Sequence, residues 1–329
     1  MDNKRLVVTS TPHTRSTETV ESIMRHVLIA LAPAAVMSVY YFGLRALLLI
    51  VLTVASCVAF ELGFEKIAGK PVTILDGSAV VTGVLLAFNL PASSPFWMPV
   101  VGSLFAIVVA KMLFGGLGQN FINPALAGRA FLMAAYTPKM AGSWTAPVRN
   151  PFSIDAVASS TPLILMKEEG FVPAAQDILN AFVGNTAGCI GETCAIALIL
   201  GGIYLLWKKV ITWHIPFAYI ATVYALSTIL GRYGIMTGDG LFEILSGGVM
   251  LGAIFMATDY TTSPVTDTGK LVMGIGCGTL TVLIRNYGGY PEGVSYSILI
   301  LNLFVPLLDK YLRPRVFGKD LPKKGEAAK

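Results

Sequence analysis

Apolar stretches close to 20 residues long recur along almost the whole chain, and they constrain its fold more than any other feature. They are separated by segments that contain Arg, Lys, Gly or Pro. About 20 apolar residues suffice for a helix to cross the hydrocarbon core of a membrane. A chain in that core must satisfy its own backbone, which only helices and closed barrels achieve. The sequence therefore predicts an all-α polytopic membrane protein.

The composition supports this class. Charged residues make up 13% of the 329 residues and hydrophobic residues 54%, whereas a soluble domain carries about 25% charged residues. The first 22 residues are polar and include Pro12 and Arg15, so no cleavable signal peptide is expected. The net charge of +5 comes largely from the C-terminal tail. We interpret that tail as a cytoplasmic anchor, and we expect no nucleic-acid partner.

About ten transmembrane helices are predicted, and the third, fifth and eighth are short or rich in glycine. With the N-terminus inside, most lysines and arginines fall in inside segments, including the seven from Lys310 onward. This bias predicts that both termini are cytoplasmic. The predicted spans cover approximately 23–42, 45–64, 73–90, 96–114, 120–136, 186–207, 212–230, 240–258, 269–286 and 293–311.

The two halves of the chain resemble each other. The segment from Gly83 to Pro95 parallels the segment from Gly252 to Pro264, and both end in Ser-Pro. Five helices per repeat is an odd number, so the second copy would be inverted in the membrane. Two inverted five-helix repeats with broken helices place ligand and ion sites near the middle of the membrane. Chance similarity between glycine-rich membrane segments is the alternative.

These patterns predict five regions. They are a cytoplasmic N-terminal segment (1–22), a first five-helix repeat (23–136), an extracytoplasmic loop (137–183), a second five-helix repeat (184–312) and a basic cytoplasmic tail (313–329).

The extracytoplasmic loop contains a candidate modification site. Asp155 stands six positions before Thr161, and small residues lie between them. A loop of this length between spans commonly has a function. The pattern suits a surface turn whose hydroxyl a modifying enzyme can reach. An ordinary turn of small residues is the alternative.

Polar residues at the starts of two predicted spans are candidates for ligand binding. Asn120 and Asn123 share one face of a helix start, and buried amides suit an isoalloxazine or pyrimidine edge. Arg129 falls inside a span, where a charge is costly and usually functional. Glu192 and Thr193 follow glycines at a helix start, where free backbone N–H groups attract anions. A polar bridge between broken helices and ordinary helix capping are the alternatives.

Acidic residues in or beside the apolar spans are candidates for an ion path. They are Asp76, Asp259, Glu61 and Glu192. Such acids commonly mark cation or proton routes. Structural pairing with Arg129 or with backbone donors is the alternative, and the sequence does not choose between Na⁺ and H⁺.

Other cofactor chemistry has little support. The four cysteines form no Cys-x-x-Cys pair and lack iron–sulfur spacing, so we expect small buried hydrophobic residues and no metal ligands. The Gly-x-Gly string at Gly274 lies inside a span with no preceding strand, which indicates a helix-packing face. No NAD site is expected in this chain.

Several longer strings carry a resemblance to a known family. Together they resemble the D subunits of Rnf complexes over nearly the whole chain, and the family is shared with the B subunits of the Na⁺-pumping NADH:quinone reductase. The strings are Thr11-Pro-His-Thr-Arg-Ser16, Gly118-Gln-Asn-Phe-Ile-Asn-Pro-Ala-Leu-Ala-Gly-Arg-Ala-Phe131, Gly188-Cys-Ile-Gly-Glu-Thr193, Thr258-Asp-Tyr-Thr-Thr-Ser-Pro-Val-Thr266 and Arg285-Asn-Tyr-Gly-Gly-Tyr-Pro-Glu-Gly293.

The resemblance implies that FMN is joined through its phosphate to Thr161. The family motif is Asp-x-x-Ser/Thr-Gly-Ala-Thr, in which Asp155 takes the first position. Ala158, Ser159 and Ser160 replace Ser/Thr, Gly and Ala, so the spacing fits and the identities depart. The hydroxyls of Ser159 and Ser160 are therefore alternative attachment sites.

The resemblance also implies a non-covalent riboflavin at Asn120 and Asn123. The helix start with Glu192 and Thr193 closes the loop that bears Thr161. We therefore expect both residues to lie near the charged phosphate ester of the FMN.

The function implied by the resemblance is electron transfer coupled to ion movement. The chain would be a membrane flavoprotein subunit of an ion-translocating ferredoxin:NAD oxidoreductase, coupling electron transfer to Na⁺ or H⁺ transport. Expected partners are a second flavin-bearing subunit, iron–sulfur subunits and a flavin transferase, at a bacterial or archaeal cytoplasmic membrane. An inverted-repeat solute channel without a redox cofactor, and a structural scaffold, are the alternatives.

Overall fold

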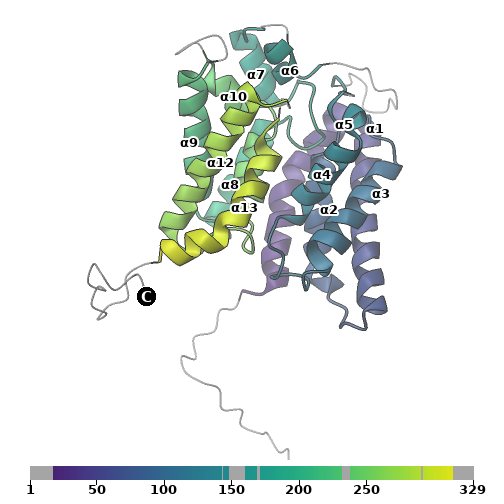
Figure 1. Cartoon of the computed structure of the whole chain (residues 1–329). Helices are drawn as coiled ribbons and strands as arrows, with labels where there is room; N and C mark the ends of the chain where they lie inside the picture. The colour runs from purple at the N-terminus through teal and green to yellow at the C-terminus, as the bar shows by residue number, and fades with distance from the viewer. Residues whose placement is uncertain are drawn as a thin grey trace, which may run out of the picture.

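The computed structural model of the chain describes residues 18–142, 144–147, 160–168, 171–231, 238–289 and 292–313. Within those residues the regular secondary structure is helical, apart from one isolated antiparallel bridge between Pro91 and Cys189. The long helices run roughly along one direction, as in a bundle (Figure 1). The predicted all-α class is confirmed.

Most helices fall within the predicted spans. In chain order the helices are α1 (Val20–Ile67), η1 (Ile74–Asp76), α2 (Ser78–Phe88), α3 (Trp97–Leu104) with its continuation η2 (Phe105–Met112), α4 (Pro124–Ala135), α5 (Thr137–Ala141), α6 (Pro162–Glu168), α7 (Ala175–Val183), α8 (Ala195–Trp207), α9 (His214–Ile229), α10 (Gly240–Leu245), α11 (Val249–Leu251) with its continuation η3 (Gly252–Met256), α12 (Asp267–Tyr287) and α13 (Val294–Tyr311). However, α4 and α8 begin later than predicted, at Pro124 and Ala195. The prediction that Asn120, Glu192 and Thr193 lie on helix starts is therefore wrong, because these residues lie in the loops before α4 and α8.

Helix α1 contains the first two predicted spans. It has 48 residues, which at about 1.5 Å per residue would exceed twice the hydrocarbon thickness if the helix were straight. Gly43 breaks it with a φ of 70° and a ψ of −165°, a conformation that residues with a side chain rarely adopt. The chain therefore forms two limbs, both purple in Figure 1.

Length and surface chemistry both indicate a membrane protein. By length and composition, α1, α12 and α13 could each cross a membrane, and five further apolar helices have 10–17 residues. Large apolar side chains face outward on several helices, as at Val36 (67% exposed), Phe217 (63%) and Leu303 (56%). Soluble proteins rarely leave extended apolar surface uncovered. Lipid or neighbouring subunits would cover these faces.

Two short helices end inside the bundle. Helix α2 has 11 residues, and α11 with η3 covers only 249–256, whereas a full crossing needs about 20. Their ends meet, since Asn89 Nδ2 lies 3.7 Å from Met256 Sδ. The third and eighth spans are thus confirmed as short. The backbone N–H and C=O groups at the ends of these two helices therefore lie inside the bundle.

The backbone that leaves α2 is satisfied from two sides. Gly191, in the loop before α8, donates its N–H to the carbonyl of Phe88 at 3.0 Å. A Cβ at position 191 would lie 2.0 Å from Phe88 Cγ, so only glycine fits. On the other side the Arg45 guanidinium donates to three successive carbonyls, those of Ala92, Ser93 and Ser94.

Glycines in α12 allow it to pack closely against α9. A Cβ at Gly274 would lie 2.7 Å from Ala218 Cβ, and one at Gly278 would lie 2.7 Å from Thr222 Cβ. Small residues let membrane helices approach in this way. The glycine string is therefore a packing face, as the sequence predicts.

The two ends of the bundle differ. The start of α1 and the end of α13 lie at the lower end in Figure 1, whereas α5, α6 and α7 lie at the upper end. The loop expected to carry a modified threonine is thus at the opposite end from the beginning and end of the helical bundle.

Candidate functional site

A pocket beside α6 brings together three residues singled out in the sequence. Thr161 lines it, together with Glu192 and Thr193 from the loop before α8. Thr161 Oγ1 accepts a hydrogen bond from Ile164 N at 3.3 Å, which is the arrangement of a helix N-cap. The folded chain therefore positions the Thr161 hydroxyl at the edge of a polar pocket.

The prediction that the Thr161 hydroxyl is exposed is wrong for this conformation. The residue is 4% exposed, and Leu163 beside it is 1% exposed. In this conformation the Thr161 hydroxyl is closed to a modifying enzyme. Asp155 and Ser159, which belong to the same motif, lie outside the described residues.

Two buried oxygens at this pocket lack a hydrogen-bond partner within the described part of the chain. Glu192 is 2% exposed, and its Oε1 accepts from Cys189 N at 3.2 Å, while its Oε2 has no partner. Ser246, which is 5% exposed, also lines the pocket and has an unpartnered Oγ. The contact of Oε1 closes the turn from Cys189 to Glu192 and caps no helix, because α8 begins only at Ala195.

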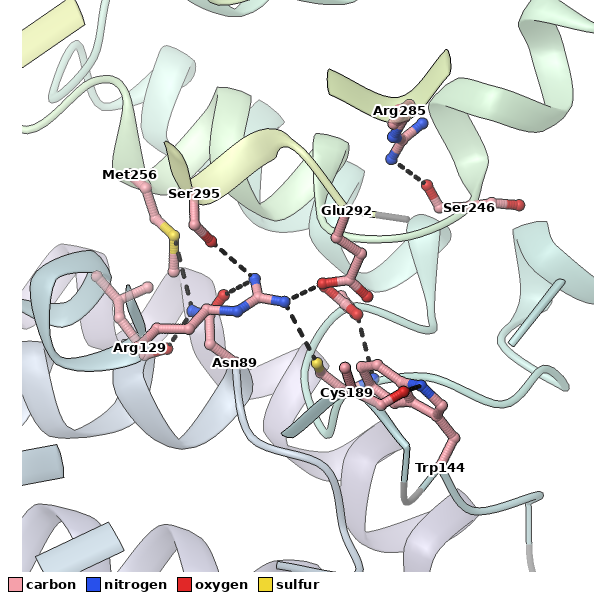
Figure 2. A network of polar contacts seen from close by, with 12 residues as sticks. Asn89, Arg129, Trp144, Cys189, Ser246, Met256, Arg285, Glu292 and Ser295 are labelled. Atoms are coloured by element: carbon pink, nitrogen blue, oxygen red, sulfur yellow. Dashed lines mark hydrogen bonds and ion pairs between the residues drawn. The ribbon is translucent and has the colours of Figure 1, made fainter. Parts of the chain in front are cut away.

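Arg129 is the centre of a buried polar junction next to this pocket (Figure 2). The side chain is 3% exposed and pairs with the Glu292 carboxylate. Its Nη1 donates to Asn89 Oδ1 at 2.7 Å and to Ser295 Oγ at 3.0 Å. Its Nη2 lies 3.8 Å from Cys189 Sγ.

Through this junction the guanidinium of Arg129 connects α4 to three other parts of the fold. Arg129 comes from α4, Asn89 from the end of α2, Ser295 from α13 and Cys189 from the loop before α8. A buried charge is tolerated only when it is paired and hydrogen-bonded. Arg129 lies inside α4, within the range of the predicted fifth span. Its partner Glu292 is none of the four acids that the sequence singled out.

Two further buried ion pairs lie within the described residues, and sequence reasoning missed both. In each pair the two oppositely charged atoms are 2.7 Å apart. A charged residue inside an apolar span is the signal that could have pointed to them. They join Lys111 with Glu61, and Arg285 with Glu243.

Each of these two cations also binds one end of a short helix. Lys111 Nζ donates to Ser78 Oγ at 2.7 Å, at the first residue of α2. Arg285 Nη2 donates at 3.0 Å to the carbonyl of Ser246, the C-cap residue of α10. The pairing alternative therefore accounts for Glu61, with Lys111 as its partner.

A second, larger cavity brings together the other predicted ligand residues. Asn120, Asn123 and Asp259 all line it, together with Ser78 and Lys111. The rest of its wall is mainly apolar, from α1, α2, α8 and η3. A mostly apolar cavity with a few polar groups is typical of a site for a small organic ligand.

The two asparagines in this cavity differ in their contacts. Asn123 Oδ1 caps α4 by accepting from Ala125 N at 3.0 Å, and its Nδ2 donates to the carbonyl of Met256 at 3.2 Å. The amide of Asn123 thus connects the start of α4 with the end of η3, which is the polar bridge considered from the sequence. Asn120 Nδ2 donates to the carbonyl of Ile122 at 3.1 Å.

The two acids proposed for an ion path lie in different settings. Asp259 Oδ2 accepts from Thr261 Oγ1 at 3.0 Å and from Thr262 Oγ1 at 3.1 Å. Asp76 Oδ1 accepts from the backbone N–H of Ser78 at 2.8 Å and from its hydroxyl at 2.6 Å. Asp76 therefore caps the start of α2, whereas Asp259 faces the cavity.

The fold and these sites define a polytopic helical membrane protein with broken helices that meet at a buried polar junction. The chain belongs to the NQR2, RnfD, RnfE family, whose model matches residues 7–318. That match covers all ten predicted spans and every candidate site residue.

Several curated relatives are similar over almost their whole length. The D subunit of the Na(+)-translocating ferredoxin:NAD(+) oxidoreductase complex of Acetobacterium woodii is 48% identical over 98% of this chain and 99% of its own. Its counterpart in the proton-translocating ferredoxin:NAD(+) oxidoreductase complex of Clostridium ljungdahlii is 44% identical over 94% and 96%. The D subunit of the ion-translocating oxidoreductase complex of Stutzerimonas stutzeri is 39% identical over 92% and 93%.

Proposed function

We propose that this chain is the D subunit of an ion-translocating ferredoxin:NAD⁺ oxidoreductase complex in a bacterial cytoplasmic membrane. Its near full-length similarity to such subunits supports the assignment. The single observation that carries the cofactor assignment is the pocket that gathers Thr161, Glu192 and Thr193. The other subunits of the complex, including a second flavin-bearing subunit and iron–sulfur subunits, would exchange electrons with it and bind NAD.

The pocket beside α6 fits a covalent FMN at Thr161. The hydroxyl lines the pocket, and Thr186 and Thr193 add two more hydroxyls that can donate to phosphate oxygens. FMN bound there would supply one- and two-electron transfer. The test is to produce the chain together with a flavin transferase, denature it and measure flavin fluorescence. A flavoprotein subunit should fluoresce, whereas a channel or a scaffold without a covalent flavin should not.

The larger cavity fits a non-covalent riboflavin. Its apolar wall suits the flavin ring, and the polar groups of Asn120, Asn123 and Asp259 line one side. Asn123 is engaged in capping and bridging. We therefore assign recognition of the flavin edge mainly to Asn120, with Asn123 shaping the wall.

Asn120→Leu should remove riboflavin and leave the covalent flavin attached, because each unpaired buried polar group on the ligand costs about 1–3 kcal/mol. The measurement is chromatography of flavin extracted from the purified protein. The exposed neighbour provides a control, since Gln119→Leu should retain riboflavin. Asp259→Asn preserves the cavity shape, so it should retain riboflavin and reduce ion transport. Stoichiometric riboflavin in Asn120→Leu would place the site elsewhere.

Asp76 and Asp259 are proposed to belong to the ion path. Asp259 lines the larger cavity, and Asp76 contacts Ser78, which lines it too. Acids beside membrane spans commonly mark such routes. The proposed ion path would thus pass the first residue of α2, Ser78, whose hydroxyl accepts a hydrogen bond from Lys111.

Two inverted repeats, approximately 23–136 and 184–312, account for paired features of the fold. Each half contains a short helix whose end meets the other at Asn89 and Met256. Lys111 and Arg285 lie about 170 positions apart, as the repeat requires, and each forms a buried ion pair. The loop between the repeats would then carry the covalent flavin.

Both termini are proposed to be cytoplasmic and α7 extracytoplasmic, because the basic residues concentrate at the end where α1 starts. In a chain whose four native cysteines are buried, Gln176→Cys should react with an impermeant maleimide in intact cells. Lys66→Cys should react only after permeabilisation. The reverse pattern would invert the topology.

A further inference from the structure

The turn that joins α8 to α9, from Trp207 to Trp213, exposes two aromatic and two basic side chains. The two tryptophans are 74% and 52% exposed, and Lys208 and Lys209 between them are exposed as well. A tryptophan carries a large apolar ring system, which a partner or a membrane interface commonly covers. This α8–α9 turn therefore presents a surface that is both aromatic and cationic.

The backbone of the turn favours glycine at position 209, where the chain has a lysine. Lys209 adopts a φ of 57°. The N–H groups of Lys209 and Val210 donate to the carbonyls of Leu206 and Leu205, each at 3.0 Å, and this pair of bonds ends α8 in a Schellman motif. Glycine is the usual residue at this place, because a side chain is disfavoured in the left-handed region. The lysine side chain is therefore retained against the preference of the backbone.

The two tryptophans lie where apolar outer faces of the bundle end. The exposed side chain of Ile203 lies one helical turn before Trp207 on α8. The exposed side chain of Phe217 lies one turn after Trp213 on α9, with the two ring centres 5.7 Å apart. Residues four apart share one face of a helix. Each apolar face thus ends at a tryptophan, which is where tryptophan is enriched in membrane proteins, at the border with water.

The turn lies at the same end of the bundle as the start of α1. His26 Nδ1, in the second turn of α1, lies 2.8 Å from Tyr204 Oη, near the end of α8. The start of α1 is at the lower end in Figure 1, as is the end of α13. Val210 and Ile211 line the larger cavity, so the same turn forms part of the wall of that cavity.

The two lysines carry positive charge that no acid balances within the described residues. Lys208 Nζ lies 5.0 Å from the centre of the Trp207 ring, and neither lysine forms an ion pair there. The acid beside the turn, Asp267, lies 3.9 Å from His214 and pairs with Lys270 at 3.3 Å. Cations near a helix C-terminus also interact with the helix dipole, but the dipole does not explain the exposed tryptophans. Basic side chains next to an aromatic border match the headgroup and the upper acyl region of an anionic lipid.

We propose that the α8–α9 turn binds the headgroup of an anionic phospholipid. The ammonium groups of Lys208 and Lys209 bind the lipid phosphate, and the rings of Trp207 and Trp213 lie at the level of the lipid glycerol. The site goes beyond the proposed function, because binding requires neither a flavin nor partner subunits. It also differs from a general attraction of this end of the bundle to the membrane, because one turn holds the lipid.

The test is the quenching of tryptophan fluorescence by brominated phospholipids, with the full chain reconstituted in phosphatidylcholine vesicles. Brominated phosphatidylglycerol is compared with brominated phosphatidylcholine, since bromine quenches only the tryptophans that contact the lipid. The wild-type chain should prefer phosphatidylglycerol by about fivefold, the effect of one lysine near an anionic membrane surface. The double variant Lys208→Gln with Lys209→Gln should lose this preference.

Two further variants separate lipid binding from folding and from general charge. Lys66→Gln with Lys70→Gln removes two exposed lysines just beyond the other limb of α1, and it should keep the wild-type preference. Lys209→Gly supplies the residue that the backbone favours, so it should unfold at the wild-type temperature or above and still show a weaker preference for phosphatidylglycerol.

Three results would overturn the proposal. They are equal quenching of the wild type by both lipids, an unchanged preference in Lys208→Gln with Lys209→Gln, and a loss of preference in the Lys66→Gln with Lys70→Gln control. The measurement is repeated on the assembled complex, where the preference should persist. Its loss on assembly would show that a partner subunit covers the turn, which would also contradict a lipid site.

Discussion

Replacing Thr161 with alanine should abolish the flavin fluorescence that survives denaturation and should stop electron transfer through the complex. Attachment needs a hydroxyl, and the tether keeps the flavin at a high effective concentration near its redox partners. The helical domain should still fold, because losing the N-cap of α6 costs only about 1 kcal/mol. The measurements are in-gel fluorescence and ferredoxin:NAD⁺ activity of the complex.

Matched serine variants separate the candidate hydroxyls. Thr161→Ser retains a hydroxyl and should retain part of the flavin, whereas Ser159→Ala and Ser160→Ala should leave the fluorescence unchanged. A transferase retained in the cytoplasm should not flavinylate the chain, because the loop is proposed to be extracytoplasmic. Full fluorescence in Thr161→Ala would move the attachment to another residue.

Replacing Arg129 with methionine should strongly destabilise the protein. The change would leave the Glu292 carboxylate buried without its counter-ion, which costs about 3–5 kcal/mol. It would also release Asn89 and Ser295, which connect the end of α2 to α13. The expected result is a large drop in the unfolding temperature of the purified protein in detergent.

A surface pair supplies the control for this prediction. Arg25 and Glu21 form an ion pair with side chains 68% and 59% exposed, and such pairs contribute about 0–1 kcal/mol. Arg25→Met should therefore change the unfolding temperature little. The double variant Arg129→Met with Glu292→Met should recover part of the lost stability. If Arg129→Met unfolds at the same temperature as Arg25→Met, the junction does not stabilise the fold.

The helical architecture could be predicted from the sequence because hydrophobicity over about 20 residues is a local signal. The break in α1 could be predicted for the same reason, since Gly43 falls in the gap between the first two apolar stretches. The grouping of Thr161 with Glu192 and Thr193 could be predicted because the segment that holds the latter two closes the loop with the threonine, although that segment precedes α8 and is not a helix start. In each case the information lies in a continuous string of residues.

The partners inside the bundle could not be predicted, because they depend on which helices meet. Arg129 and Glu292 are 163 positions apart, and periodicity within a span does not identify such a pair. The same holds for Lys111 and Glu61. The burial of Thr161 also depends on how α6 packs, which a polar loop sequence does not reveal.

The most direct test of the central claim is the mass of the peptide that contains Thr161. The chain would be produced together with an active flavin transferase, purified and digested, and the peptide spanning Ser153 to Lys167 sequenced by mass spectrometry. The account predicts a peptide heavier by FMN less one water, with the added mass on Thr161. A peptide of unmodified mass, or one modified at Ser159 or Ser160, would contradict it.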